Sequence, residues 1–232
     1  MVTDSNRLFL DMFSDRERIA HYADGPRRFT PGLDAVHRMT AILLAEHAPA
    51  DAHVLVLGAG GGLELTALAQ AQPGWRFTGV DPASPMLDLA RQALGDDAGR
   101  ADLVEGYIDE APAGPFDAAT CLLTLHFLAR DERVRTLREM HRRLSPGAPL
   151  VVVHSSFPQD EPARTRWLER YAAYAVASGA DPAQTEQARA AVAASLALLT
   201  PEEDAACLRD AGFEAVELFY AAFTWRGWVA RA

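Results

Sequence analysis

The sequence feature that most constrains the fold is a glycine-rich turn between a predicted strand and a predicted helix. Residues 54–57 (VLVL) form a short apolar run that ends at a glycine, and we predict a buried strand there. Gly58, Gly60 and Gly62 follow, and residues 63–72 read as a helix. Glycines at such a turn adopt positive φ readily and let backbone N–H groups approach a ligand closely. The turn therefore predicts a binding site at the carboxyl end of a buried strand.

A second predicted strand ends on an acidic residue that suits a nucleotide. Residues 76–80 form this strand and Asp81 follows it. A carboxylate at the end of a strand, beside a glycine-rich turn, can accept hydrogen bonds from ribose hydroxyls. The NAD fingerprint G-x-G-x-x-G would need a glycine where the chain has Leu63, whereas G-x-G-x-G fits. An NAD-linked reductase is therefore disfavoured, and a turn whose glycines serve packing alone stays as the alternative.

This arrangement resembles motifs I and II of the class I S-adenosylmethionine (SAM) dependent methyltransferases. The resemblance implies a single α/β domain over residues 1–232, with SAM as the cofactor. It implies a Rossmann-like, doubly wound, mostly parallel seven-stranded sheet with an antiparallel last strand. The acid that the family usually carries two residues before Gly58, where it helps to bind the methionine amino group of SAM, is Val56 here. Backbone atoms of the turn are therefore expected to do more of the cofactor binding.

The composition favours a small-molecule partner over a nucleic acid. Among 232 residues, 22 are Lys or Arg and 32 are Asp or Glu, which gives a formal net charge of −10, and no sustained basic block occurs. A polyanionic partner would meet long-range repulsion. The N-terminus has charges among its apolar residues and no cleavage-site pattern, and no run approaches the length of a membrane span. We therefore expect a cytoplasmic protein without a membrane segment.

The use of cysteine and histidine argues against a metal site. The chain has two cysteines, Cys121 and Cys207, and they form no C-x-x-C motif. No histidine pair has the spacing of metal ligands. We therefore expect neither a metal nor a disulfide framework.

The residues before the first strand predict a helical cap over residues 1–52. Helices are expected over residues 8–21 and 31–47, the second opened by a P-G-L-D sequence and ended before a proline. Such a cap would lie over the open ends of the strands, where Arg28 and Phe29 could line a substrate pocket. The alternative is a solvated arginine and an aromatic packing anchor.

The third predicted strand, residues 102–105, leads into the loop that the resemblance assigns to adenine. A helix is predicted before it, over residues 84–94. In the family this loop usually carries an acid that accepts the adenine amino group, and the matching position is Tyr107. The resemblance therefore implies a contact from Tyr107, with Ile108 packed on the adenine ring.

Two histidines at strand ends are the candidates for a general base. His126 follows the fourth predicted strand, residues 116–123, where the methyl group of the cofactor should point. His154 ends the fifth predicted strand, residues 150–154. An imidazole has a suitable pKa for proton transfer near neutral pH. The alternative for each is a histidine whose hydrogen bonds are satisfied by backbone groups.

An amphipathic helix is predicted between these two strands, over residues 131–144. Its apolar residues recur at helical spacing, and the arginines fall largely off that stripe. We expect a solvated face formed by Arg133, Arg135, Arg138, Arg142 and Arg143.

An insertion of two helical segments follows the fifth strand. Residues 159–199 contain predicted helices at 161–178 and 182–198, and their position after the strand predicts a lid over the site. Tyr171 could line the pocket from this lid, although a packing stripe or a dimer surface would give the same pattern.

The chain ends with an antiparallel strand pair, predicted over residues 214–220 and 223–230. Trp225 lies on the last strand and could form part of an aromatic wall for an acceptor. Core packing is the alternative. The apolar tail and the lid together make a homodimer a reasonable expectation.

Three phrases resemble the carboxy-S-adenosylmethionine synthases and the methyltransferases related to them. They are RFTPG at residues 28–32, LTLHFL at 123–128 and the closing run over 211–230. A synthase of this family joins a carboxylate derived from prephenate to SAM. The match in layout covers nearly the whole chain.

The residues that hold the extra carboxylate in that family differ here. An aromatic hydroxyl is replaced by Leu33, an asparagine by Leu122, and the clamping arginine by Ala191, with Arg189 close by in sequence. These changes remove charge-assisted contacts to a carboxylated cofactor. We therefore place the synthase second.

The sequence predicts a SAM-dependent methyltransferase that acts on a small molecule. One alternative is a carboxy-SAM synthase, and another is a regulatory or scaffold protein that keeps the fold without group transfer. The predicted cofactor contacts are Gly58, Ala59, Gly60, Gly62, Asp81, Pro82, Tyr107, Ile108 and Leu122. The predicted substrate contacts are Arg28, Phe29, Tyr171, Arg189 and Trp225, and the predicted catalytic residues are His126 and His154.

Overall fold

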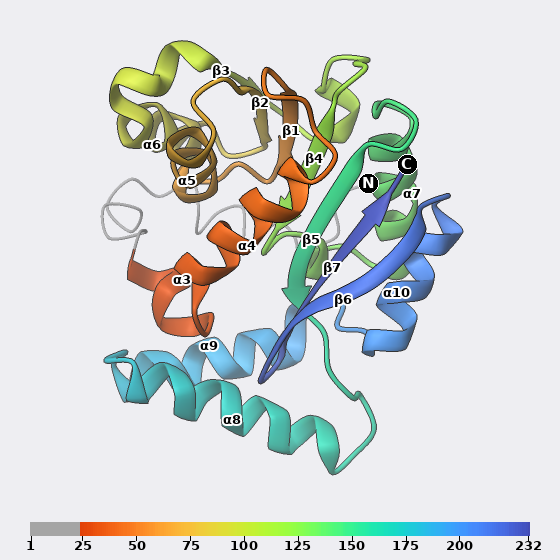
Figure 1. Ribbon diagram of the computed structural model, residues 1–232. Coiled ribbons are helices and arrows are strands. Elements are labelled where there is room, and N and C mark those ends of the chain that lie inside the picture. The colour runs from red at the N-terminus through yellow and green to blue at the C-terminus, as the bar shows by residue number, and fades with distance from the viewer. Residues whose placement is uncertain (1–23) are drawn as a thin grey trace.

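Figure 1 shows the protein as a computed structural model, which describes residues 24–232. The helix predicted over residues 8–21 lies outside that range. Within it, seven strands form one sheet in the order β3-β2-β1-β4-β5-β7-β6. In chain order the strands are β1 (His53–Leu57), β2 (Arg76–Asp81), β3 (Ala101–Glu105), β4 (Ala118–Leu122), β5 (Pro149–Ser155), β6 (Glu214–Ala222) and β7 (Trp225–Arg231).

The strand directions confirm the predicted sheet. β1 pairs in parallel with β2 and β4, β2 pairs in parallel with β3, and β4 pairs in parallel with β5. β7 runs antiparallel to both β5 and β6. The strand order changes direction at β1, because the chain continues from β1 to β2 on one side and later places β4 on the other side. In such sheets the crevice outside the carboxyl ends of the strands is where ligands bind.

Helices cover both faces of the sheet, as Figure 1 shows. The helices α4 (Leu33–Ala45), α5 (Leu63–Ala71) and α6 (Ser84–Leu94) lie on one face, and α7 (Arg130–His141) and α10 (Pro201–Asp210) lie on the other. The two cores follow from alternation along β1. Val54 and Val56 pack toward the first set of helices, and Leu55 and Leu57 toward the second. No helix within residues 24–232 is long and apolar enough to cross a bilayer.

Most predicted elements agree with the structure to within a few residues. The fourth strand is shorter than predicted because Leu123, with φ of 55°, leaves the extended conformation. The segment predicted to connect the first two helices contains a short helix, α3 (Asp24–Phe29). The predicted helix over residues 131–144 ends at His141, and a turn follows.

The insertion forms two helices that pack on one another, α8 (Ala163–Ala177) and α9 (Pro182–Ser195). They lie beyond the carboxyl end of β5, next to α3 (Figure 1). The rings of Phe29 and Tyr171 are 5.2 Å apart at this contact. Residues 159–199 therefore pack against the cap, and their role as a lid over the site stays a prediction.

The arginines of α7 do not all form a solvated face, and that expectation was wrong for Arg133. Arg133 is completely buried and makes an ion pair with Asp204 of α10, whose side chain is also buried. It donates two further hydrogen bonds, to the backbone carbonyls of Leu128 (3.1 Å) and Ala197 (2.7 Å). Docking of α10 on α7 supplies the counter-charge that lets this position be buried.

Candidate functional site

A cavity of about 330 Å³ lies at the carboxyl ends of β1, β2 and β4. Its walls are the turn after β1, the end of β2, the loop after β3, and the segment that joins β4 to α7. The cap contributes Pro26, Leu33 and His37. The structure brings to this cavity eight of the nine predicted cofactor contacts, Gly58, Ala59, Gly60, Asp81, Pro82, Tyr107, Ile108 and Leu122.

Gly58 must be a glycine in this structure. Its φ is 78°, and a Cβ atom on it would overlap the Thr124 side chain, which follows β4. The N–H groups of Gly58 and Ala59 both donate to the Val80 carbonyl, at 2.8 and 3.0 Å. The turn is thereby fixed to the end of β2 and closed against the end of β4.

Gly62 differs from the other predicted contacts because it does not line the cavity. It caps the N-terminus of α5 in a left-handed conformation, with φ of 80°. A Cβ atom there would lie 2.7 Å from Cα of Ala90 on α6. The geometry assigns this glycine to close packing of α5 on α6.

Asp81 holds two turns of the site together. Its Oδ2 accepts a hydrogen bond from the Gly60 N–H at 2.9 Å, and its Oδ1 accepts one from the Ala83 N–H at 2.9 Å. Burial raises the pKa of Asp81, and the two backbone hydrogen bonds oppose that rise. A carboxylate has about four acceptor positions, so this group can still accept hydrogen bonds from two hydroxyls in the cavity.

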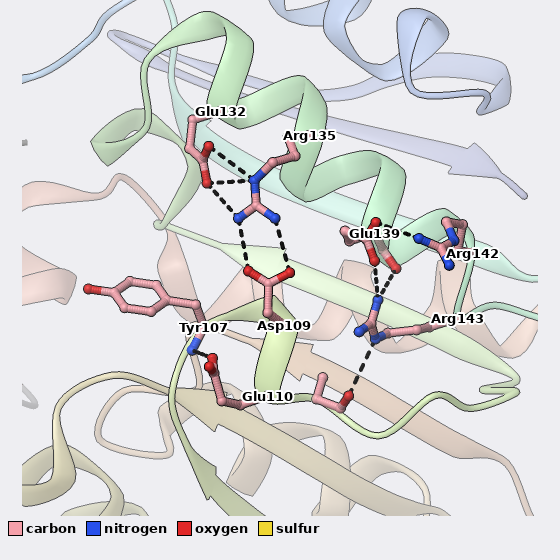
Figure 2. A network of polar contacts seen from close by, with 9 residues as sticks. Tyr107, Asp109, Glu110, Glu132, Arg135, Glu139, Arg142 and Arg143 are labelled. Carbon is pink, nitrogen blue, oxygen red and sulfur yellow. Dashed lines mark hydrogen bonds and ion pairs between the residues drawn. The ribbon is translucent and has the colours of Figure 1, made fainter. Parts of the chain in front are cut away.

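An ion-pair network positions the loop after β3. Figure 2 shows Arg135 of α7 between Asp109 of that loop and Glu132 of its own helix. The Arg135 Nη1 to Asp109 Oδ1 distance is 3.0 Å. The Tyr107 N–H donates to Glu110 at 2.8 Å, and its ring points away from the ion pairs (Figure 2). These charges are about half exposed, so they orient the loop more than they stabilise the fold.

Neither predicted catalytic histidine lines the cavity. His126 is buried, its Nδ1 accepts the Ser155 N–H at 3.3 Å, and its ring lies 5.6 Å from that of Trp225. His154 is buried with its Nε2 3.2 Å from Asp204 Oδ1. Burial lowers the pKa of both imidazoles. The geometry thus favours the alternative, histidines that serve the core, because the turn after β4 directs His126 inward.

The five predicted substrate contacts also lie outside the main cavity. Arg28 and Phe29 line a second hollow against α9, and Tyr171 packs on Phe29. Trp225 donates from its indole N–H to the Phe29 carbonyl at 2.9 Å. Arg189 is paired with Glu186 of its own helix at 2.8 Å. These residues join the cap to the insertion and the last strand.

Several residues that line the cavity were not predicted from the sequence, among them His37 and Glu64. Burial lowers the pKa of His37 to about 4, and burial raises that of Glu64 to about 8. Thr124 and Phe127 come from the segment after β4. The sequence did contain one signal that Glu64 lies near the site, because this residue comes two positions after the last glycine of the turn. Within residues 24–232 the structure gathers no three metal-ligating side chains.

Comparison with protein families and curated proteins is consistent with this site. Residues 54–147 match the methyltransferase domain family, a span that includes the glycine turn, Asp81 and the loop after β3. A carboxy-SAM synthase of Chromohalobacter salexigens is 30% identical over 210 residues, covering 89% of this chain and 78% of the relative. The synthase of Actinobacillus succinogenes is 26% identical over 225 residues, covering 94% of this chain and 92% of the relative.

Solved structures share the fold at lower identity. Human N-acetylserotonin methyltransferase in complex with SAM has a TM-score of 0.63 at 17% identity, covering 99% of this chain. The [4+2]-cyclase SpnF has a TM-score of 0.59 at 20% identity, covering 80% of this chain. The matched region spans 60% of each of those two chains. The chain belongs to the class I SAM-dependent methyltransferases, close to the carboxy-SAM synthases, and its cofactor is SAM.

Proposed function

We propose that the protein transfers the methyl group of SAM to a small-molecule acceptor. The observation that carries this proposal is the charge of the cavity lining. Within the described part of the chain, Arg135 is the one arginine that lines the cavity, and Asp109 and Glu132 already pair with it. A carboxylate added to the cofactor would need a cation near the methyl carbon. This lining therefore suits SAM better than its carboxylated derivative.

The proposed reaction is an in-line displacement at the methyl carbon. A lone pair of the acceptor forms the new bond while the carbon–sulfur bond breaks, and its electrons stay on sulfur, which gives S-adenosylhomocysteine. The protein supplies position and exclusion of water. Leu122, Phe127 and Leu128 give the cavity an apolar wall for this step. His37 is neutral at pH 7, because burial lowers its pKa to about 4. Its imidazole can therefore accept a hydrogen bond from the small molecule that receives the methyl group.

The second candidate is a carboxy-SAM synthase, which the curated relatives favour. Both of the relatives described above carry that name, and they cover most of this chain. Against this candidate stand Leu33, Leu122 and Ala191, which replace the polar residues expected for the extra carboxylate, and the exposed ion pair of Arg189.

Mass spectrometry separates the two candidates. The purified protein would be extracted for bound nucleosides, and then incubated with SAM and prephenate. Methyl transfer predicts bound SAM or S-adenosylhomocysteine and no carboxy-SAM in either experiment. Carboxy-SAM in the extract or after incubation would overturn the proposal in favour of the synthase. A folded protein that neither carries nor binds a nucleoside would favour the non-catalytic alternative.

Replacement of Asp81 tests the assignment of the ribose. We expect Asp81→Asn to weaken S-adenosylhomocysteine binding about 10- to 100-fold, because a charge-assisted hydrogen bond contributes about 1.5–3 kcal/mol. The new amide would also turn a donor toward the N–H of Gly60 or Ala83. Isothermal titration calorimetry gives the affinity. The matched control is Asp88→Asn on α6, whose carboxylate pairs with Arg91 outside the cavity, and equal affinities for the two variants would contradict the assignment.

A homodimer and a cytoplasmic location stay predictions. Leu218 and Phe223, near the edge of the sheet, are 54% and 42% exposed, which supports a packing partner there. Light scattering on the eluting protein should give twice the chain mass, and a single-chain mass would remove the dimer from this account.

A further inference from the structure

Glu64 is a buried acid that the reaction proposed above does not use. It is the second residue of α5, directly after the glycine turn, and it lines the cavity. Its relative exposure is 6%, and its Oε1 has no hydrogen-bond partner among the described residues. A buried carboxyl oxygen without a hydrogen-bond partner is costly to the fold, so we expect a bound group to satisfy it.

The neighbours of Glu64 connect it with the position where the chain lacks an acid. Its carboxyl group lies against Thr120 of β4, and Thr120 pairs in register with Val56 of β1. Paired residues of neighbouring strands point to the same face of a sheet. Glu64 therefore reaches, from the helix above, the part of the sheet where related methyltransferases carry their acid and this chain has Val56.

The charge state of Glu64 fits a ligand cation. Burial raises its pKa to about 8, and the Thr120 hydroxyl offsets that rise only in part. No charged side chain among residues 24–232 contributes to this shift, so the site without ligand holds a mostly protonated carboxyl group at pH 7. A cation within about 4–6 Å would favour the ionised form. The neighbouring Gly58, Ala59 and Gly60 are the residues that we expect around the methionine part of SAM, which ends in an ammonium group.

We infer that Glu64 binds the α-ammonium group of the methionine part of SAM and takes the place of the acid that is absent at Val56. This inference rests on the SAM site of the proposed function. The carboxyl group loses its proton to solvent when the ammonium group binds, and the resulting ion pair is screened from water by α5 and the sheet. The contact is specific to the amino-acid end of the cofactor and leaves the nucleoside end unaffected.

Two ligands that differ at that end provide the test. S-adenosylhomocysteine carries the ammonium group, and 5′-methylthioadenosine has the same nucleoside and sulfur without it. We expect Glu64→Gln to weaken S-adenosylhomocysteine binding about 10- to 100-fold and to change 5′-methylthioadenosine binding less than about twofold. The control is Glu105→Gln, the same chemical change at an exposed residue of β3, which should alter neither affinity.

A second readout uses the unaltered protein. Titration of S-adenosylhomocysteine at pH 7 in phosphate and in Tris buffer reports proton release, because the two buffers differ in ionisation enthalpy. We expect net release from the wild-type protein and a loss of that release in Glu64→Gln. Equal weakening for both ligands, or unchanged S-adenosylhomocysteine binding with unchanged proton release, would overturn the assignment of Glu64. A wild-type protein that binds neither ligand would overturn the SAM site itself, so the two failures are distinct.

Discussion

Replacing Arg133 with leucine is expected to lower the free energy of unfolding by about 3–5 kcal/mol, since removal of one partner leaves a buried charge unpaired. Asp204, which is 1% exposed, would lose its buried counter-charge and keep the contact of its Oδ1 with His154 Nε2, 3.2 Å away. The variant also removes the donors to the carbonyls of Leu128 and Ala197, so the start of α7 and the end of the insertion both lose a contact. Urea unfolding followed by circular dichroism measures the change.

An arginine directly after the same helix is the matched control. Arg142 pairs with Glu139 at 2.8 Å, but its side chain is 69% exposed. Exposed ion pairs contribute about 0–1 kcal/mol, so Arg142→Leu should leave the unfolding midpoint nearly unchanged. If the two leucine variants proved equally stable, the buried pair between α7 and α10 would not have the role given to it here.

Replacing Gly58 with alanine is expected to remove measurable SAM binding. The left-handed conformation at φ of 78° costs a non-glycine residue about 1–2 kcal/mol, and the added Cβ would also overlap the Thr124 side chain. The turn must move to relieve both, and its hydrogen bonds to the Val80 carbonyl and to Asp81 then lose their geometry. We expect at least a 100-fold loss of affinity for S-adenosylhomocysteine by calorimetry, with a lower thermal midpoint.

Gly99→Ala is the control for this substitution. Nothing lies within 4 Å of a Cβ atom built on Gly99, so the variant should bind and unfold like the wild type. Wild-type affinity in Gly58→Ala would mean that the turn tolerates a side chain and that the cofactor does not depend on its geometry.

The parts of the site that the sequence predicted are those fixed by local patterns. An apolar run, a glycine turn, a helix and a strand that ends on Asp81 follow one another along the chain, and each step follows from short-range backbone preferences. The parallel sheet then brings the carboxyl ends of β1, β2 and β4 to one edge whatever the details of the side chains. That is why the cavity contains most of the predicted cofactor contacts.

The residues that were missed or misplaced depend on contacts distant in sequence. His126 follows β4 as predicted, but the positive φ of Leu123 and the packing of Trp225 turn its ring into the core. Arg133 is buried because a carboxylate 71 residues away pairs with it. Glu64 and His37 reach the cavity because of how α5 and α4 rest on the sheet, and a helical pattern alone does not specify that rotation.

Calorimetric titration of the wild-type protein with SAM, S-adenosylhomocysteine and NADH tests the SAM site most directly. We expect saturable one-to-one binding of SAM and S-adenosylhomocysteine, lost in Gly58→Ala and weakened in Asp81→Asn, with no heat from NADH. A folded protein that binds NADH, or that binds neither sulfur nucleoside, would contradict the assignment of this cavity to SAM.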